Sequence, residues 1–233
     1  MAHPARRSTD FARGIAALLP ALGLLATAPA GHAADDWDVP PDPRTAHEAI
    51  AGPALTFLPE PPAEPVHHHH TLAIIDARSL EDGWVRLEQC HEHLDAFPSA
   101  AVVYRGSRIR GLEIVSVEGI DAAWVEDARI ELRGIRPGAR LCMKAESRAL
   151  TDNGDGTWTL RNGPFMRQLM DGYFPMHVTM DVRLPPGLGL LSAHPRPRPG
   201  LAIRTRPGRI ELDAWFEGRL VTALILGPVG DGR

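Results

Sequence analysis

The sequence predicts an all-β domain, an antiparallel β-sandwich or open barrel of about ten short strands. Apolar and charged residues alternate with a period of two along several segments, which is typical of strands with one buried face. The clearest segments are Met176–Leu184, Arg209–Phe216 and Ala128–Arg133. Turn sequences such as Arg206-Pro207-Gly208 and Asp152–Gly156 separate the apolar runs. One apolar and one charged face per strand favours antiparallel pairing.

The C-terminal part is expected to form a three-stranded meander. Its strands would be Leu201–Thr205, Arg209–Phe216 and Arg219–Leu226, with Glu217-Gly218 as the second turn. Further expected strands are Thr71–Ala77, Trp84–His93, Ala101–Tyr104, Arg108–Val117, Arg140–Leu150 and Thr157–Arg161.

One short helix is expected near residues 164–171, with Asn162 as its cap and Gly172 after its end. Its apolar residues share one helical face: Phe165, Met166, Leu169 and Met170. Such a helix would cover an open end of the sheets as a plug. Alternatively it would form a lid over a pocket, for which the polar groups are Arg167, Asp171 and Tyr173.

The N-terminal region predicts export. Residues 1–33 have a positive start, a short apolar run and a small-x-small cleavage sequence, Gly31-His32-Ala33, so they are expected to be a signal peptide. Ala34 follows the expected cut, where a lipid-anchored protein would have cysteine. We therefore expect a soluble periplasmic or secreted protein. Residues 34–70 are proline-rich and are expected to be a disordered linker, and residues 71–228 to form the β domain.

Composition argues against two classes of partner. The net charge of the chain is −4, and removal of Arg6, Arg7, Arg13 and Asp10 with the signal makes it about −6. Nucleic-acid binding needs a concentrated excess of basic residues, which this sequence lacks. After signal cleavage, no apolar run is long enough for a membrane span. A periplasmic protein partner is compatible with this composition.

The two cysteines, Cys90 and Cys142, are expected to form a disulfide, because an exported chain enters an oxidising compartment. Closing a loop of about 52 residues would lower denatured-state entropy by roughly 4 kcal/mol. The alternative, a thiolate metal ligand or redox centre, lacks the favoured Cys-x-x-Cys spacing.

Histidines are the candidate metal ligands. On a strand, His91 and His93 would share the outer face while Cys90 turns inward, so the two imidazoles could bind Zn²⁺ or Cu²⁺. His177 is a candidate third ligand from a neighbouring strand. The tract His67, His68, His69 and His70 closes the expected linker and would act as a mobile metal-capturing arm.

These patterns favour a non-catalytic binding or accessory protein, with Zn or Cu as the candidate ion and no cofactor established. No Gly-x-Ser-x-Gly elbow or phosphate-binding loop is present. Two alternatives stay open. One is an envelope interaction module that needs no metal and binds through a sheet edge or the Phe165–Tyr173 segment. The other is an enzyme with a pocket under residues 164–173, which requires Arg167, Asp171, Tyr173 and His177 to converge.

Overall fold

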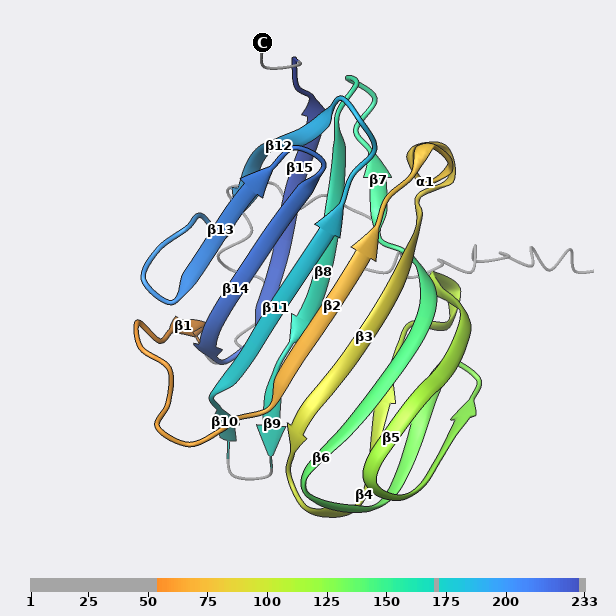
Figure 1. Ribbon diagram of the computed structural model, residues 1–233, viewed down its shortest axis with the longest axis vertical. Helices are drawn as coiled ribbons and strands as arrows, with labels where there is room; N and C mark the ends of the chain where they lie inside the picture. The colour runs from red at the N-terminus through yellow and green to blue at the C-terminus, as the bar shows by residue number, and fades with distance from the viewer. Residues whose placement is uncertain (1–53, 170–171, 231–233) are drawn as a thin grey trace, which may run out of the picture. The chain divides into compact units, whose positions relative to one another are not determined.

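The computed structural model describes residues 54–169 and 172–230, which form an all-β domain and confirm the predicted fold class (Figure 1). Residues 1–53, which include the predicted signal peptide and the first part of the predicted linker, lie outside the described residues. The described strands are β1 (Thr56–Phe57), β2 (His68–Ile74), β3 (Trp84–Leu94), β4 (Phe97–Val103), β5 (Ile109–Glu126), β6 (Arg129–Arg148), β7 (Leu150–Asp152), β8 (Trp158–Phe165), β9 (Arg167–Leu169), β10 (Gly172–Phe174), β11 (Met176–Arg183), β12 (Leu188–His194), β13 (Leu201–Arg206), β14 (Arg209–Glu217) and β15 (Leu220–Pro228).

The strands form one large sheet, a four-stranded sheet and a small ladder. The large sheet has the order β1-β14-β11-β2-β3-β6-β4, with β13 also paired to β14 and β5 to β6. The second sheet has the order β12-β15-β8-β7, and β9 pairs with β10. All pairs are antiparallel except β2 with β11, which run parallel. The large sheet is therefore mixed, which the alternation pattern alone did not predict.

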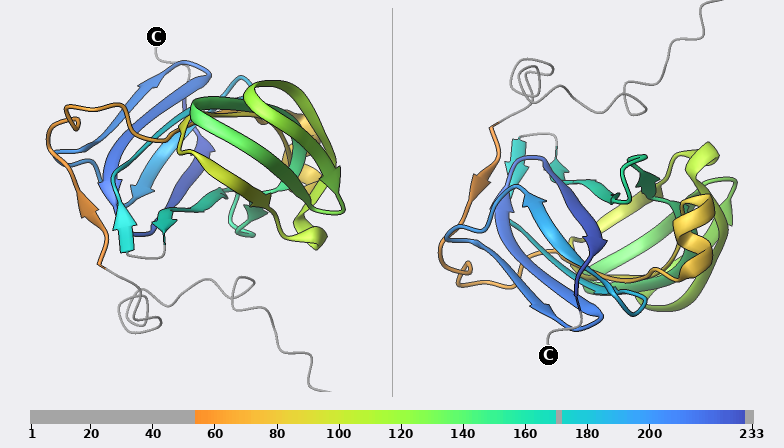
Figure 2. Two further views of the ribbon diagram at one scale, coloured as in Figure 1. Left: turned by 90° about the horizontal axis from the view of Figure 1, so that it is seen from below. Right: turned by 90° about the horizontal axis from the view of Figure 1, so that it is seen from above.

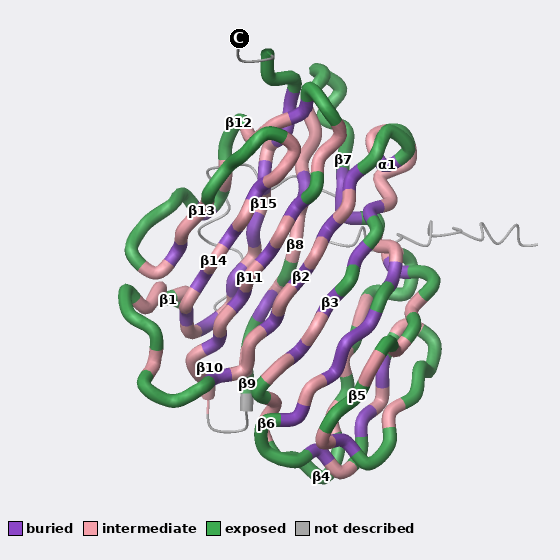
Figure 3. The backbone as a smooth tube through the Cα atoms, in the orientation of Figure 1, coloured by how far each residue is buried: buried purple, intermediate pink, exposed green. Residues whose placement is uncertain are grey.

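A hydrophobic core fills the space between the two sheets. The inner faces of β11 and β14 supply alternate buried residues, as predicted, and the second sheet supplies buried leucines of β15 (Figures 2 and 3). Phe216 is the largest fully buried side chain at 0% exposure. The buried faces are typical of a sandwich with one solvated face on the large sheet.

The predicted C-terminal meander is only half correct. β13 and β14 form the expected hairpin, but β15 leaves the large sheet and joins the second one. Both β14 and β15 have one buried face in the same core. Two buried faces can pack against each other only if the strands lie in opposite layers, so Glu217-Gly218 is a corner between sheets.

A second core lies inside a curled group of strands, in which β3, β4 and β5 all pair with β6. β3 and β4 follow one another along the same edge of β6, since Leu94 is paired with Ala139 and Phe97 with Ile135. The strands bend at this point, so that the far halves fold back over the near halves (Figure 2). Tyr104, just after β4, thereby reaches Gln89 in the middle of β3, where its hydroxyl donates to Gln89 Oε1 at 2.9 Å.

The predicted helix near residues 164–171 is wrong. Residues up to Phe165 continue β8, which pairs with β15, and Arg167–Leu169 and Gly172–Phe174 form a ladder. Backbone pairing with a neighbouring strand outweighs an apolar helical spacing that spans less than two turns. The α-helix of the described residues is instead α1 (Ala77–Asp82), and η1 (Gly106–Arg108) is a 3-10 turn. Asp76 caps α1, because its side chain accepts a hydrogen bond from the Ser79 amide.

Candidate functional site

The histidine tract lies within the large sheet. His68–His70 begin β2, a central strand between β11 and β3, so the prediction that they belong to a disordered linker is wrong. The β domain also begins before residue 71. Alternation along β2 sends His68 and His70 to the outer, solvated face and His69 to the inner face.

The outer face brings His68, His70 and His177 together around Thr179, a set that we term the outer cluster. His68 Nε2 lies 2.7 Å from Thr179 Oγ1, and His70 Nδ1 lies 2.9 Å from the same oxygen. His68 Nδ1 lies 3.3 Å from Glu92 Oε2. An ionised carboxylate only accepts, so His68 Nδ1 donates to Glu92, Thr179 donates to His68 Nε2, and His70 Nδ1 donates to Thr179.

Aromatic stacking holds this cluster in place. The rings of His177 and Trp215 stack at 3.8 Å between centroids, and those of His177 and His68 stack at 4.2 Å. His177 Nε2 lies 2.9 Å from Asp213 Oδ1. The three rings therefore form a column across β14, β11 and β2, in which stacking occupies the flat faces and hydrogen bonds to Glu92, Thr179 and Asp213 occupy ring nitrogens.

Two charged side chains, Glu92 of β3 and Arg140 of β6, lie next to the outer cluster. Arg140 Nε donates to Glu92 Oε1 at 3.0 Å. Burial alone would raise the pKa of Glu92, but hydrogen bonds from Arg140 and His68 lower it below its ordinary value. Burial and the neighbouring His177 lower the pKa of His68. An ionised Glu92 beside a neutral His68 is the arrangement that orients a metal-binding imidazole.

The inner face carries His67, His69 and His91, which we term the inner cluster. His67 Nε2 and His91 Nδ1 are 3.0 Å apart, and the rings of His69 and His91 stack at 4.4 Å. Thr71 contacts His69 Nε2 at 3.3 Å, and Gln89 Nε2 donates to Thr71 Oγ1 at 3.3 Å. With Tyr104 on Gln89, these contacts form a polar seam beside the two hydrophobic cores.

Burial keeps the inner imidazoles neutral. Burial first, then the charge of Arg167, lowers the pKa of His67 to about 4, although Asp95 opposes this. Burial and then His67 lower the pKa of His91 to about 3. The pKa of His69 is also well below its ordinary value because that ring is buried. His91 Nε2 is buried and has no hydrogen-bond partner among the described residues.

The predicted pairing of His91 with His93 on the outer face is wrong. His91 is 7% exposed and faces the inner side in phase with Val85 and Leu87. The register shifts between His91 and Leu94, and His93 has a φ of 53°, so the alternation ends there. His93 is exposed and apart from His91. The two imidazoles of this His-x-His sequence thus do not converge on one ion. Other histidines remain the candidate metal ligands.

The predicted disulfide between Cys90 and Cys142 is confirmed. The two residues are directly opposite on β3 and β6, with Cα atoms 4.1 Å apart. The expected direction is reversed, however, because Cys90 alternates with the inward-facing Gln89 and His91 and so lies on the outer face. Arg140 Nη2 lies 3.5 Å from Cys90 Sγ.

The residues of the predicted enzyme pocket do not converge. Arg167 forms a two-point ion pair with Asp95, at 2.6 and 2.9 Å. Tyr173 is paired with Gln168, one residue beyond Arg167, so Arg167 and Tyr173 lie on opposite faces of the β9–β10 ladder. His177 lies on the outer face of the large sheet with Asp213. Asp171 lies outside the described residues.

Two negative findings concern the described residues alone. Among them, no three His, Cys, Asp or Glu side chains are arranged to hold a metal ion as they stand. None of their helices has the length and apolar character required to span a bilayer.

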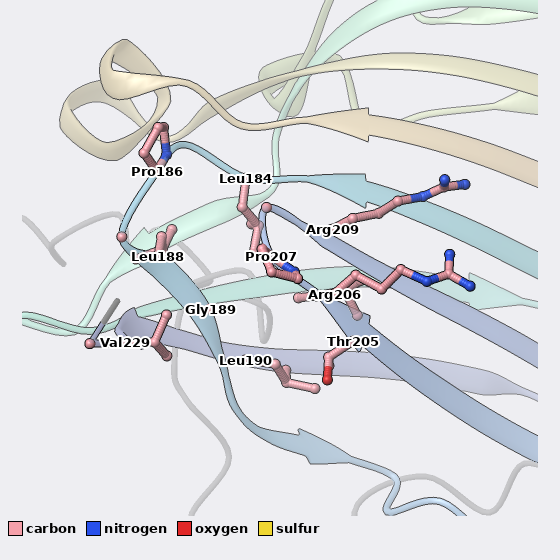
Figure 4. Close-up of a pocket in the computed structure, with 14 residues that line it drawn as sticks. Leu184, Pro186, Leu188, Gly189, Leu190, Thr205, Arg206, Pro207, Arg209 and Val229 are labelled. Carbon is pink, nitrogen blue, oxygen red and sulfur yellow. The ribbon is translucent and has the colours of Figure 1, made fainter. Parts of the chain in front are cut away.

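A cavity of about 590 Å³ opens at the far end of the sandwich, between β12 and the β13–β14 turn. Leu184, Leu188, Leu190 and Val229 are among its lining residues, and no histidine lines it. The side chains of Arg206 and Arg209 extend away from the apolar lining (Figure 4). Both guanidinium groups pair with Glu211, at 3.0 and 2.9 Å. None of the side chains labelled in Figure 4 therefore directs a charged group into the cavity.

No protein-family model and no curated protein matches the chain. The solved structures that are similar include three with TM-scores of 0.39, 0.41 and 0.39 and identities of 16%, 14% and 15%. Two are of a mutant M1 zinc metallopeptidase from Deinococcus radiodurans, one of them bound to a Tyr-Ser-Ala substrate, and the third is of a two-domain mutant M1 zinc metallopeptidase bound to L-tryptophan. Each match covers 70% of this chain and 42% of the other.

Proposed function

We propose that the protein is an exported, non-catalytic binding protein that holds a Zn²⁺ or Cu²⁺ ion on the outer cluster. The observation that carries the proposal is the convergence of His68 Nε2 and His70 Nδ1 on one atom, Thr179 Oγ1, at 2.7 and 2.9 Å. The disulfide supports the location, because such bonds persist in oxidising compartments outside the cytoplasm.

The geometry requires only a small rearrangement to accept an ion. Zinc–imidazole bonds are about 2.0–2.1 Å long, so an ion near the position of Thr179 Oγ1 would draw each ring inward by less than about 1 Å. Thr179 would turn away, and the proton on His70 Nδ1 would move to Nε2. Glu92 already holds the far nitrogen of His68, as carboxylates do behind metal-binding histidines. Water would complete the coordination.

The test uses oxidised protein purified without a nickel column. Elemental analysis of protein from its native compartment and calorimetric titration with Zn²⁺ and Cu²⁺ should both give about one ion per chain. The double variant His68→Ala/His70→Ala should bind at least about tenfold more weakly, whereas His93→Ala, an exposed histidine outside the cluster, should bind like the parent. Equal affinity in the double variant and the parent would exclude the outer cluster.

A second candidate is an interaction module that binds through β4 and β5. Of the nine large apolar residues exposed in the described chain, six belong to these strands: Phe97, Val103, Val115, Val117, Trp124 and Val125. β5 pairs with β6 along one edge, and no pairing is described for its other edge. Strand addition to that edge is a known mode of protein recognition. If Val115→Lys/Val117→Lys abolishes capture of a partner while metal removal does not, this function replaces metal binding.

A further inference from the structure

The disulfide shares a row of the outer face with His70 of β2. Strand register places Thr179 beside His70, His70 beside Cys90, and Cys90 beside Cys142. Ser116 of β5 continues the row beyond Cys142. Thr179, His70, Cys90 and Cys142 therefore lie on four neighbouring strands with no other residue between them.

We infer that the disulfide is the closed form of a thiolate–imidazole metal site, in which reduced Cys90 and Cys142 bind an ion together with His70. The inference extends the proposed function and rests on it for its imidazole ligand. Neighbouring residues of adjacent strands have Cβ atoms about 4.5–5.5 Å apart. Metal–ligand bonds of about 2.3 Å to sulfur and 2.0 Å to nitrogen place the donor atoms of a tetrahedral site about 3.5 Å apart, a separation that the side chains of such neighbours can reach.

The reduction step balances with a dithiol as the reductant. A dithiol thiolate attacks one sulfur of the Cys90–Cys142 bond and releases the other as a thiolate. The second sulfur of the reductant then resolves the mixed disulfide, so the reductant is oxidised to a disulfide and the protein gains two thiols. Binding of a divalent ion then displaces two protons, one from each thiol.

The surroundings favour both the exchange and the binding. Cys90 is half-buried on the solvated face, whereas Cys142 is 6% exposed, so an incoming thiolate reaches Cys90. In the reduced protein, the Arg140 guanidinium 3.5 Å from Cys90 Sγ stabilises a thiolate there. His70 must turn from Thr179 toward Cys90. His68, which contacts the same Thr179 oxygen, is the candidate fourth ligand.

The ligand set selects the ion. Two thiolates with one or two imidazoles suit Zn²⁺ or Cu⁺, which accept soft sulfur donors, whereas the oxidised outer cluster offers nitrogen alone. Reduction would therefore move bound metal from a nitrogen site beside Thr179 to a sulfur–nitrogen site further along the same row of the sheet face. The change alters affinity and ion preference without requiring a change of fold.

The test is a titration of Co²⁺ into the oxidised and the reduced full-length chain, with the reductant removed under anaerobic conditions. The reduced protein should bind about one Co²⁺ with a sulfur-to-cobalt charge-transfer band and tetrahedral visible bands, and the oxidised protein should show no charge-transfer band. His70→Ala should weaken the reduced site at least about tenfold. His93→Ala, on the same strand as Cys90, is the matched control and should leave the site unchanged.

The two proposals fail separately. A reduced chain without the charge-transfer band, or with equal affinity in His70→Ala and the parent, overturns the thiolate site whatever the oxidised protein binds. Absence of metal on the oxidised protein, with the band present after reduction, overturns the imidazole site alone. Circular dichroism must show that the reduced chain keeps its sheet, and loss of that signal also overturns the inference, since the site depends on strand register.

Discussion

Acidification from pH 7 to pH 5 should strongly destabilise the protein through the inner cluster. His67 and His91 are neutral in the folded state, with pKa values near 4 and 3, against an ordinary value of 6.5. At pH values below 6.5 the unfolded chain takes up protons on these imidazoles and the folded chain does not. The free energy of unfolding therefore falls as pH falls, until the pH reaches the folded pKa values.

The magnitude follows from the difference in pKa. Each imidazole that is protonated only in the unfolded chain lowers the free energy of unfolding by about 1.4 kcal/mol for each pH unit below its ordinary pKa. Between pH 7 and pH 5 the loss is therefore about 2 kcal/mol per imidazole. Two such groups give about 4 kcal/mol, a large part of the 5–15 kcal/mol typical of a domain. With a urea dependence of about 2 kcal/mol per molar, the unfolding midpoint should fall by roughly 2 M.

Urea unfolding followed by circular dichroism at pH 7 and pH 5 measures this fall. His91→Gln removes one titrating ring and should reduce the difference between the two midpoints by roughly 1 M. His194→Gln changes an exposed histidine of β12 and should leave the difference intact. An unchanged midpoint in the parent, or an undiminished difference in His91→Gln, would refute the argument that buried neutral imidazoles make the fold acid-sensitive.

Two further predictions concern the bend of β6 and the Arg167 ion pair. Gly134→Ala should lower the free energy of unfolding by about 2–3 kcal/mol, because Gly134 has a φ of 64° and a Cβ there would overlap the Asp121 side chain. Gly138→Ala, at a φ of 77° with open space around the position, should cost only about 1 kcal/mol, and equal losses in thermal melts would contradict the steric explanation. The second prediction concerns the ion pair of Arg167, which is 17% exposed, with Asp95, which is 31% exposed. A double-mutant cycle of Arg167→Gln with Asp95→Asn, measured by urea unfolding, should give a coupling free energy of about 2 kcal/mol. A coupling near zero would show that the pair adds nothing to stability.

The alternation of apolar and polar residues predicted the strands that lie over a core, because a strand with one buried face has an apolar residue at every second position. Met176–Arg183 and Arg209–Glu217 show it, and both are strands with buried Val178 and Ala214. The same pattern does not show to which of the two sheets a strand belongs. Leu220–Pro228 therefore looked like a third strand of one meander, although it pairs in the second sheet.

The site was harder to predict because its residues meet across strands that are distant in sequence. His177 lies beside His68 because β11 pairs in parallel with β2, and the residue pattern within either strand does not predict this pairing. The phase of His91 was predictable, however. Val85 and Leu87 set the inward face of β3, and counting by two from them places His91 inward and Cys90 outward. The expectation that the cysteines face the interior gives the reverse assignment for His91.

The parallel pairing of β2 with β11 also has a consequence for how the chain assembles. β3, β4 and β5 all pair with β6, so the ladders of this part lie within residues 84–148 and can form while the rest of the chain is still unpaired. The β2–β11 ladder instead closes a loop from His68 to His177, whose entropic cost is about 4 kcal/mol by the logarithmic law. We expect the central ladder to form late, after the C-terminal strands are available, and folding to be correspondingly slow.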